Sequence, residues 1–145
     1  MDKGFVYSIA ISAQRGELKH EIVSAMFIEN YGIEGDGHAG DWTRQVTVLN
    51  YESVERINKE RKLSMRPGDF AENVLIRGVD LSQLQPSDRL QLGDSVVLEI
   101  AQIGKEDHPS VVTRTFGVSL LPYEGLFCKV IRGGTVKKGD VVAMV

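Results

Sequence analysis

The sequence predicts a mainly β fold, a largely antiparallel β-barrel with one or a few short helices. Short apolar segments rich in valine, isoleucine and leucine recur along the 145 residues, and their lengths are those of strands. Gly-Asp pairs recur between such segments, and both residue types favour turns, because glycine adopts positive φ without steric cost and aspartate hydrogen-bonds to nearby backbone. Many short strands joined by tight turns are typical of a barrel.

Seven segments are the predicted strands. In chain order they cover residues 5–12, 46–49, 73–78, 88–93, 95–104, 125–134 and 141–145. In the fifth of them, Val96, Leu98 and Ile100 share one face by two-residue alternation. The predicted turns are the Gly-Asp pairs that begin at Gly35, Gly40, Gly68, Gly93 and Gly139.

One segment, residues 50–62, predicts a helix. Asn50 is a suitable residue to cap its first turn. Apolar residues repeat at helical spacing, namely Tyr51, Val54 and Ile57. Ion pairs with i,i+4 spacing are also predicted, Glu52 with Arg56 and Glu55 with Lys59. Because the apolar face is narrow, we expect this helix to cover an end of the barrel.

Length and composition limit the function. A chain of 145 residues fits a single domain, residues 1–145, that folds without disulfides or a structural metal. The net charge of -3 gives no general attraction to nucleic acid or anionic membrane, and no apolar stretch is long enough to span a bilayer. A cytoplasmic protein is therefore expected. The single cysteine, Cys128, lies in an apolar run and is expected to be buried and inert.

The richest polar segment is "GIEGDGHAGDWTRQVTVLN", residues 32–50. A glycine loop of this kind can bring backbone N–H groups close to a phosphate or pterin, while Arg44 offers a planar fork for an oxyanion and Gln45 offers both donor and acceptor groups. The alternative is a surface loop in which Arg44 forms an ordinary salt bridge and Trp42 is a core residue with a cation stacked on it. The residues alone leave both interpretations open.

Two other polar segments favour plain interpretations. In "MRPGDFAENVLIRG", residues 65–78, Asp69 is expected to close a turn, and Asn73 to bond to neighbouring backbone. In "IGKEDHP", residues 103–109, carboxylates and one imidazole suggest a metal site for which His38 is the other available imidazole. Adjacent residues seldom chelate without partners from elsewhere, so a solvated turn is favoured here.

Four segments together resemble the MOSC domain, named for the C-terminal domain of molybdenum cofactor sulfurase, and most closely its small stand-alone bacterial members. They are "GIEGDGHAGDWTRQVTVLN", "RPGDFAENVLIRGVDL", "LQLGDSVVLEIAQIGKEDH" and "PYEGLFCKVIRGGTVKKGD". The resemblance implies a MOSC-type β-barrel and a site for a molybdenum cofactor, molybdopterin. It also implies either reduction of N-hydroxylated small molecules or sulfur transfer. The cofactor-binding residues that it implies are His38, Arg44, Gln45, Glu72, Asn73 and Lys105, and the catalytic ones are Asp107 and His108.

The sequence departs from the family pattern at the residue that carries its chemistry. The family has a cysteine where this chain has Asp107, and a second cysteine position holds Ser119. One hypothesis is an oxidoreductase in which Asp107 ligates molybdenum through oxygen; the other is a non-catalytic carrier or chaperone that binds the pterin phosphate through Arg44. A barrel used only for protein contacts is a third. The expected partners are a pterin-type cofactor, a small-molecule substrate and a redox or cofactor-biosynthesis protein, without nucleic acid or membrane.

Overall fold

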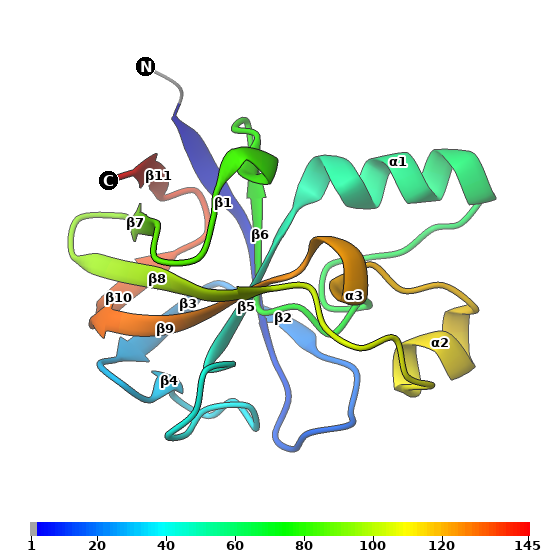
Figure 1. The fold of residues 1–145 in the computed structure, drawn as a ribbon, viewed down its shortest axis with the longest axis horizontal. Coiled ribbons are helices and arrows are strands. Elements are labelled where there is room, and N and C mark those ends of the chain that lie inside the picture. Colours follow the sequence, from blue (N-terminus) through cyan, green and yellow to red (C-terminus); the bar gives the residue numbers. More distant parts are fainter. Residues whose placement is uncertain (1–2) are drawn as a thin grey trace.

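The computed structural model describes residues 3–145, in which seven strands form a closed barrel (Figure 1). Around the ring the order is β11, β7, β8, β9, β5, β6 and β1, and the ring closes because β11 pairs with both β7 and β1. All neighbours are antiparallel except β5 and β6, which run parallel. The bounds are Gly4–Ile11 (β1), Val46–Asn50 (β5), Val74–Arg77 (β6), Arg89–Leu92 (β7), Val96–Ile103 (β8), Leu126–Arg132 (β9) and Val141–Met144 (β11).

The predicted mainly β barrel is confirmed, and each of the seven predicted segments overlaps one strand of the ring, with bounds that differ by at most two residues. The glycines of all five predicted Gly-Asp turns have positive φ, a backbone conformation that glycine adopts without steric cost. Val96, Leu98 and Ile100 lie together in the buried core, which confirms the alternation predicted for β8.

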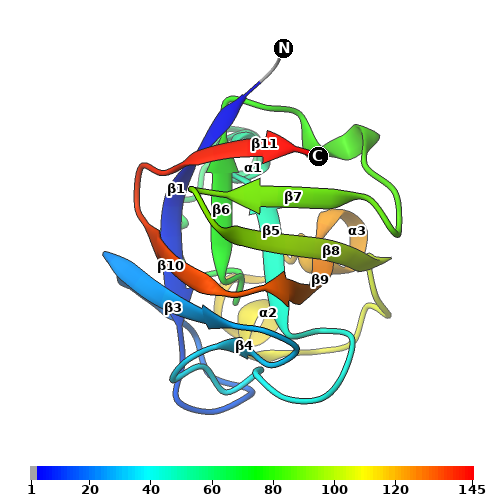
Figure 2. The ribbon, with the colours of Figure 1, turned by 90° about the vertical axis from the view of Figure 1, so that its left-hand side faces the viewer.

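Four further strands were not predicted. They are β2 (His20–Ile22), β3 (Ser24–Ile28), β4 (Gly32–Ile33) and β10 (Gly134–Lys137). Strand β2 extends the barrel wall beside β1, and the other three form a small sheet across one side of the barrel (Figure 2). Strand β3 carries apolar residues on both faces, since buried Phe27 alternates with exposed Met26 and Ile28, so the sequence shows no polar alternation that would reveal it.

All three α-helices lie on one side of the barrel, with α1 (Tyr51–Arg61), α2 (Val111–Phe116) and α3 (Leu121–Glu124) grouped beyond β5 and β6 (Figure 1). One core fills the barrel, and a second lies between its wall and the helices. Val48 faces the barrel core, whereas the next residue, Leu49, packs with Val54 and Ile57 of α1. The prediction that this helix covers a barrel end is therefore wrong: it packs on the outside of the wall.

The predicted helix is present, but its local stabilising contacts are not those expected. Asn50 makes no side-chain cap; its amide donates to the carbonyls of Ile76 and Val79 and accepts from Leu81 N–H. Among the described residues neither predicted i,i+4 ion pair forms, and Arg56 pairs with Glu124 of α3 instead. These side chains reach tertiary partners that helical spacing does not reveal.

Over residues 3–145, none of the helices has the length and apolar character that a membrane crossing needs.

Candidate functional site

Two adjoining cavities lie outside the barrel wall, next to α2 and α3. They share His38, Ala71, Lys105 and Leu121 in their linings, and together they are called the His38 cavity below. The smaller part, about 80 Å³, is also lined by Trp42, Arg44, Thr47 and Phe127. The larger part, about 280 Å³, continues past residues 109–112 to Arg114 and Ser119. The structure thus brings together three of the predicted cofactor-binding residues, His38, Arg44 and Lys105.

The charged side chains around the cavity are mostly cationic. Arg44 lies over the ring of Phe127, 5.1 Å from its centroid, and its Nη2 is 3.6 Å from the Glu106 carboxylate. Burial, and next the Arg44 guanidinium, lower the pKa of Lys105. Arg114 adds a third positive charge at the exposed rim. This arrangement suits an anionic ligand better than a cationic one.

The loop between β4 and β5 lines the cavity with His38, Trp42 and Arg44. Three of its amides are already used within the protein: Gly37 N–H donates to the carbonyl of Ser12, His38 N–H to Asp36, and Gly40 N–H to the carbonyl of Tyr31. The predicted cation stacked on Trp42 is Arg15, 4.0 Å from the ring centroid, and not Arg44. The N–H groups of residues 37, 38 and 40 are therefore not available to a phosphate in the cavity.

A buried ion pair, which the sequence did not reveal, supports His38. The Lys19 ammonium lies 2.7 Å from the Asp36 carboxylate, and both side chains are fully buried. The same ammonium is 3.0 Å from Nδ1 of His38. Burial and the neighbouring Lys19 charge lower the pKa of His38 to about 4. His38 is therefore a neutral imidazole at the wall of the cavity.

Two glycines allow the segment that carries Lys19 to approach so closely. A Cβ on Gly37 would lie 2.6 Å from the backbone of Gln14, and a Cβ on Gly68, where φ is +89°, would clash with the Lys19 carbonyl. The segment before β2 therefore packs directly against the glycine loop and against the turn before β6. "ELKHE" has the composition of an exposed segment, so the glycines were the only sequence signal for this packing.

Three predicted cofactor-binding residues lie away from the cavity lining and hold backbone instead. Gln45 is fully buried, accepts from Val130 N–H and donates to Asn30. Asn73 accepts from Thr47 N–H and donates to the carbonyl of Ala10, which joins β5 to β1 and confirms its expected bonding to backbone.

Glu72, the third of these residues, is buried and accepts hydrogen bonds from the N–H groups of Gly68 and Phe70. Burial raises its pKa to about 7, against the lowering effect of these bonds. The turn that it holds ends at Ala71, which lines the cavity with a φ of 66°. Asp69 accepts from Arg66 N–H and closes this turn as predicted.

Asp107 and His108 do not line the His38 cavity. The Asp107 carboxylate accepts a hydrogen bond from the hydroxyl of Tyr123, and His108 is exposed in the loop that follows β8. Residues 3–145 contain no cluster of three or more histidine, cysteine, aspartate or glutamate side chains that could hold a metal. In this conformation the Asp107 carboxylate bonds to Tyr123 and would not contact a ligand in the His38 cavity.

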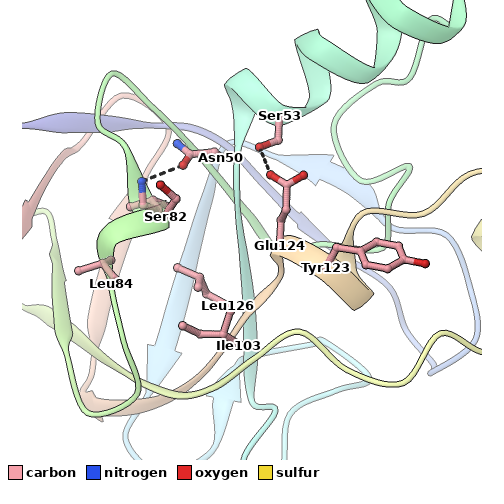
Figure 3. Close-up of a pocket in the computed structure, with 9 residues that line it drawn as sticks. Asn50, Ser53, Ser82, Leu84, Ile103, Tyr123, Glu124 and Leu126 are labelled. Atoms are coloured by element: carbon pink, nitrogen blue, oxygen red, sulfur yellow. Dashed lines mark hydrogen bonds between the residues drawn. The ribbon is translucent and has the colours of Figure 1, made fainter.

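A separate cavity of about 140 Å³ lies between α1, α3 and the end of β8 (Figure 3). Its carboxylate, Glu124, accepts from Ser53 and pairs with Arg56, and Asn50 is fully engaged with backbone. The remaining lining is largely apolar, from residues such as Leu84, Ile103 and Leu126. Because Glu124 and Asn50 already have partners, this cavity is a weaker candidate than the cationic His38 cavity.

Comparisons with known proteins agree with this description. The family model of the MOSC domain matches residues 35–105, a segment that contains His38, Arg44 and Lys105. The chain belongs to the MOSC domain family. No curated protein sequence matches it.

Solved structures share the fold of this MOSC domain over nearly its whole length. The YuaD protein from Bacillus subtilis has a TM-score of 0.77 at 19% identity, with 98% of this chain and 97% of that chain covered. YiiM from Geobacillus stearothermophilus has a TM-score of 0.76 at 14% identity, covering 98% of this chain and 75% of that one. YiiM from Escherichia coli has a TM-score of 0.69 at 18% identity, covering 100% and 70%.

Cys128, the only cysteine of this MOSC domain, is inside the barrel. Its side chain is fully buried in the core, and burial raises the pKa of the thiol far above its usual range. We expect native protein to react with an aromatic disulfide reagent at least about 100-fold more slowly than protein unfolded in guanidinium, because the thiolate is the reactive form. Absorbance of the released thiolate measures both rates. Equal rates would contradict the buried position.

Proposed function

We propose that this MOSC domain binds the phosphate-bearing pterin of a molybdenum cofactor in the His38 cavity and acts as a carrier rather than as a catalyst. Three cationic side chains line it, Arg44 in the smaller part, Arg114 in the larger part and Lys105 in both, and they match the charge of a phosphate. This set of positive charges is the observation on which the proposal rests. When bound, such a cofactor would supply a redox-active metal; the protein would supply charge and hydrogen bonds.

Each cavity residue has a distinct part in the proposed binding. Arg44 is held in place by the face of Phe127 and by Glu106, so its planar fork is oriented before a ligand arrives. Lys105, which lines both parts of the cavity, provides a compact second charge. His38, as a neutral imidazole, orients the ligand through a hydrogen bond without adding charge.

The positions of two side chains favour the carrier role over the oxidoreductase role: the carboxylate that would ligate molybdenum and the thiol that would carry sulfur. The Asp107 carboxylate is bonded to Tyr123, and the Cys128 thiol lies in the barrel core. Within residues 3–145, no sulfur atom therefore faces the cavity. Its cationic side chains still fit the phosphate-bearing organic part of the cofactor.

Retention of molybdopterin by purified protein tests the proposal. We expect Arg44→Ala to weaken retention about 10- to 100-fold, the usual effect of losing charge-assisted hydrogen bonds to an anion. Arg89→Ala is the matched control, because Arg89 pairs with Glu99 on the barrel wall away from the cavity. Fluorescence of the oxidised pterin measures the bound fraction. If Arg44→Ala and wild type retain the same amount, the proposal is wrong.

Asp107 variants separate the carrier from the oxidoreductase. A carrier predicts that Asp107→Ala keeps both pterin and molybdenum at wild-type levels and that wild type shows no turnover of N-hydroxylated substrates. Loss of molybdenum, but not of pterin, in Asp107→Ala would instead favour Asp107 as a ligand. Asp107→Cys restores the family residue and shows whether the loop can carry the missing chemistry.

A further inference from the structure

The Lys19 ammonium is surrounded by three acceptors inside the protein. Its Nζ lies 2.7 Å from Asp36 Oδ1, 3.2 Å from Ser12 Oγ and 3.0 Å from His38 Nδ1. An ammonium has three N–H donors and no acceptor. Each of its donors therefore has one partner, and Lys19 is fully satisfied although its side chain is completely buried.

This geometry determines the tautomer of His38. Because Lys19 can only donate, Nδ1 of His38 must accept, and the proton of the neutral ring must be on Nε2. Nε2 lies on the opposite edge of the imidazole from Lys19, and His38 lines both parts of the cavity. Two further contacts hold the loop around the ring: His38 N–H donates to Asp36, and Trp42 Nε1–H donates to the His38 carbonyl over 2.7 Å.

We propose that Lys19 is a positioning residue that locks His38 as the Nε2–H tautomer, so that the imidazole is a constant hydrogen-bond donor to an oxyanion or carbonyl oxygen of the ligand. The inference rests on the proposed function for the identity of the ligand, but the tautomer itself depends only on Lys19, Asp36 and His38. A ligand that offered a donor at this position would leave two N–H groups facing one another and would be rejected.

Burial and the surrounding charges keep the His38 ring neutral across the physiological range. Burial lowers the pKa of His38 most, the charges of Lys19, Arg15 and Lys105 lower it further, and Asp36 raises it. Glu17, Arg44 and Arg114 complete the ionisable groups that share its cavity linings. Ordinary histidine changes charge between about pH 5 and pH 8, so a donor at this position would otherwise vary in strength with pH.

Nitrogen-15 NMR of the histidine ring tests the proposal on wild-type protein without any ligand. At pH 7 we expect His38 to show a pyridine-type Nδ1 and a protonated Nε2. The ring should become a cation only on acidification toward about pH 4. A protonated Nδ1, or an imidazolium at pH 7, would overturn the proposal whether or not the cavity binds a pterin.

Lys19→Met removes the ammonium and keeps most of the side-chain volume. We expect the midpoint of His38 titration to rise by about one pH unit or more and the ring to lose its single tautomer. Since this variant leaves Asp36 buried without a counter-charge, Lys19→Met/Asp36→Asn serves as a second, neutral version. An unchanged His38 titration in whichever variant folds would contradict a positioning role for Lys19.

The effect of His38 on anion binding is measured with inorganic sulfate, whose charge does not change between about pH 4 and pH 8. His38→Leu should weaken sulfate binding about tenfold, and His38→Gln, which retains an N–H donor, should remain within about threefold of wild type. Equal loss in both variants would contradict the donor role. If wild-type protein binds neither sulfate nor molybdopterin, the proposed function fails, whereas the NMR result still decides the tautomer.

Discussion

Asp36→Ala is expected to lower the free energy of unfolding by about 3–5 kcal/mol, one of the two largest effects expected in this protein. The substitution leaves the Lys19 ammonium buried without its counter-charge, in a site where both side chains are fully inaccessible to solvent. It also removes the acceptor for the N–H groups of Ser12 and His38. Urea denaturation, followed by circular dichroism, measures the change.

Two controls distinguish a buried pair from an exposed one. Glu21→Ala breaks the ion pair with Lys138 at the surface and should cost at most about 1 kcal/mol. Lys19→Met/Asp36→Leu removes both buried charges and should recover much of the stability that Asp36→Ala loses, because apolar replacement of a buried pair is often neutral or stabilising. A double variant no more stable than Asp36→Ala would show that the backbone donors, rather than the charge, dominate the effect.

The barrel could be predicted from the sequence because its signals are local. The seven apolar segments and the five Gly-Asp turns depend on side-chain type and backbone conformation within a few residues. The helix was predictable for the same reason. The contacts of the helix could not be predicted, because its partners lie far away in the sequence: Arg56 bonds to Glu124, and Asn50 bonds to the segment after β6.

The candidate site was predictable only in part. Arg44, His38 and Lys105 do meet at one cavity, although Lys105 comes from a different segment of the chain than the other two. Gln45, Glu72 and Asn73 have the polar side chains expected of ligands, yet they hold the backbone around the site. Polar residue type alone does not distinguish these two uses. The burial of Lys19 depends on the close approach of two loops, and no residue near Lys19 in the sequence indicates it.

Glu72 is expected to make the stability of the protein fall as the pH rises. Burial raises its pKa from 4.5 to about 7 in the folded state. Between these values the folded protein holds a proton that the unfolded chain has released, so the stabilisation is complete below about pH 4.5 and is lost as the pH rises through 7. A change of this size corresponds to roughly 3 kcal/mol.

His38 acts in the opposite direction, so the wild-type profile alone does not isolate Glu72. The pKa of His38 is lowered in the folded state, from 6.5 to about 4, and its contribution to stability therefore increases as the pH rises through that interval. Glu72→Gln removes one titration and leaves the other. We expect the difference in unfolding free energy between wild type and Glu72→Gln to shift in favour of the variant between pH 5 and pH 8, by up to roughly 3 kcal/mol. A difference that does not change with pH would show that the Glu72 carboxyl ionises at its ordinary pKa, with the two N–H groups of Gly68 and Phe70 compensating for its burial.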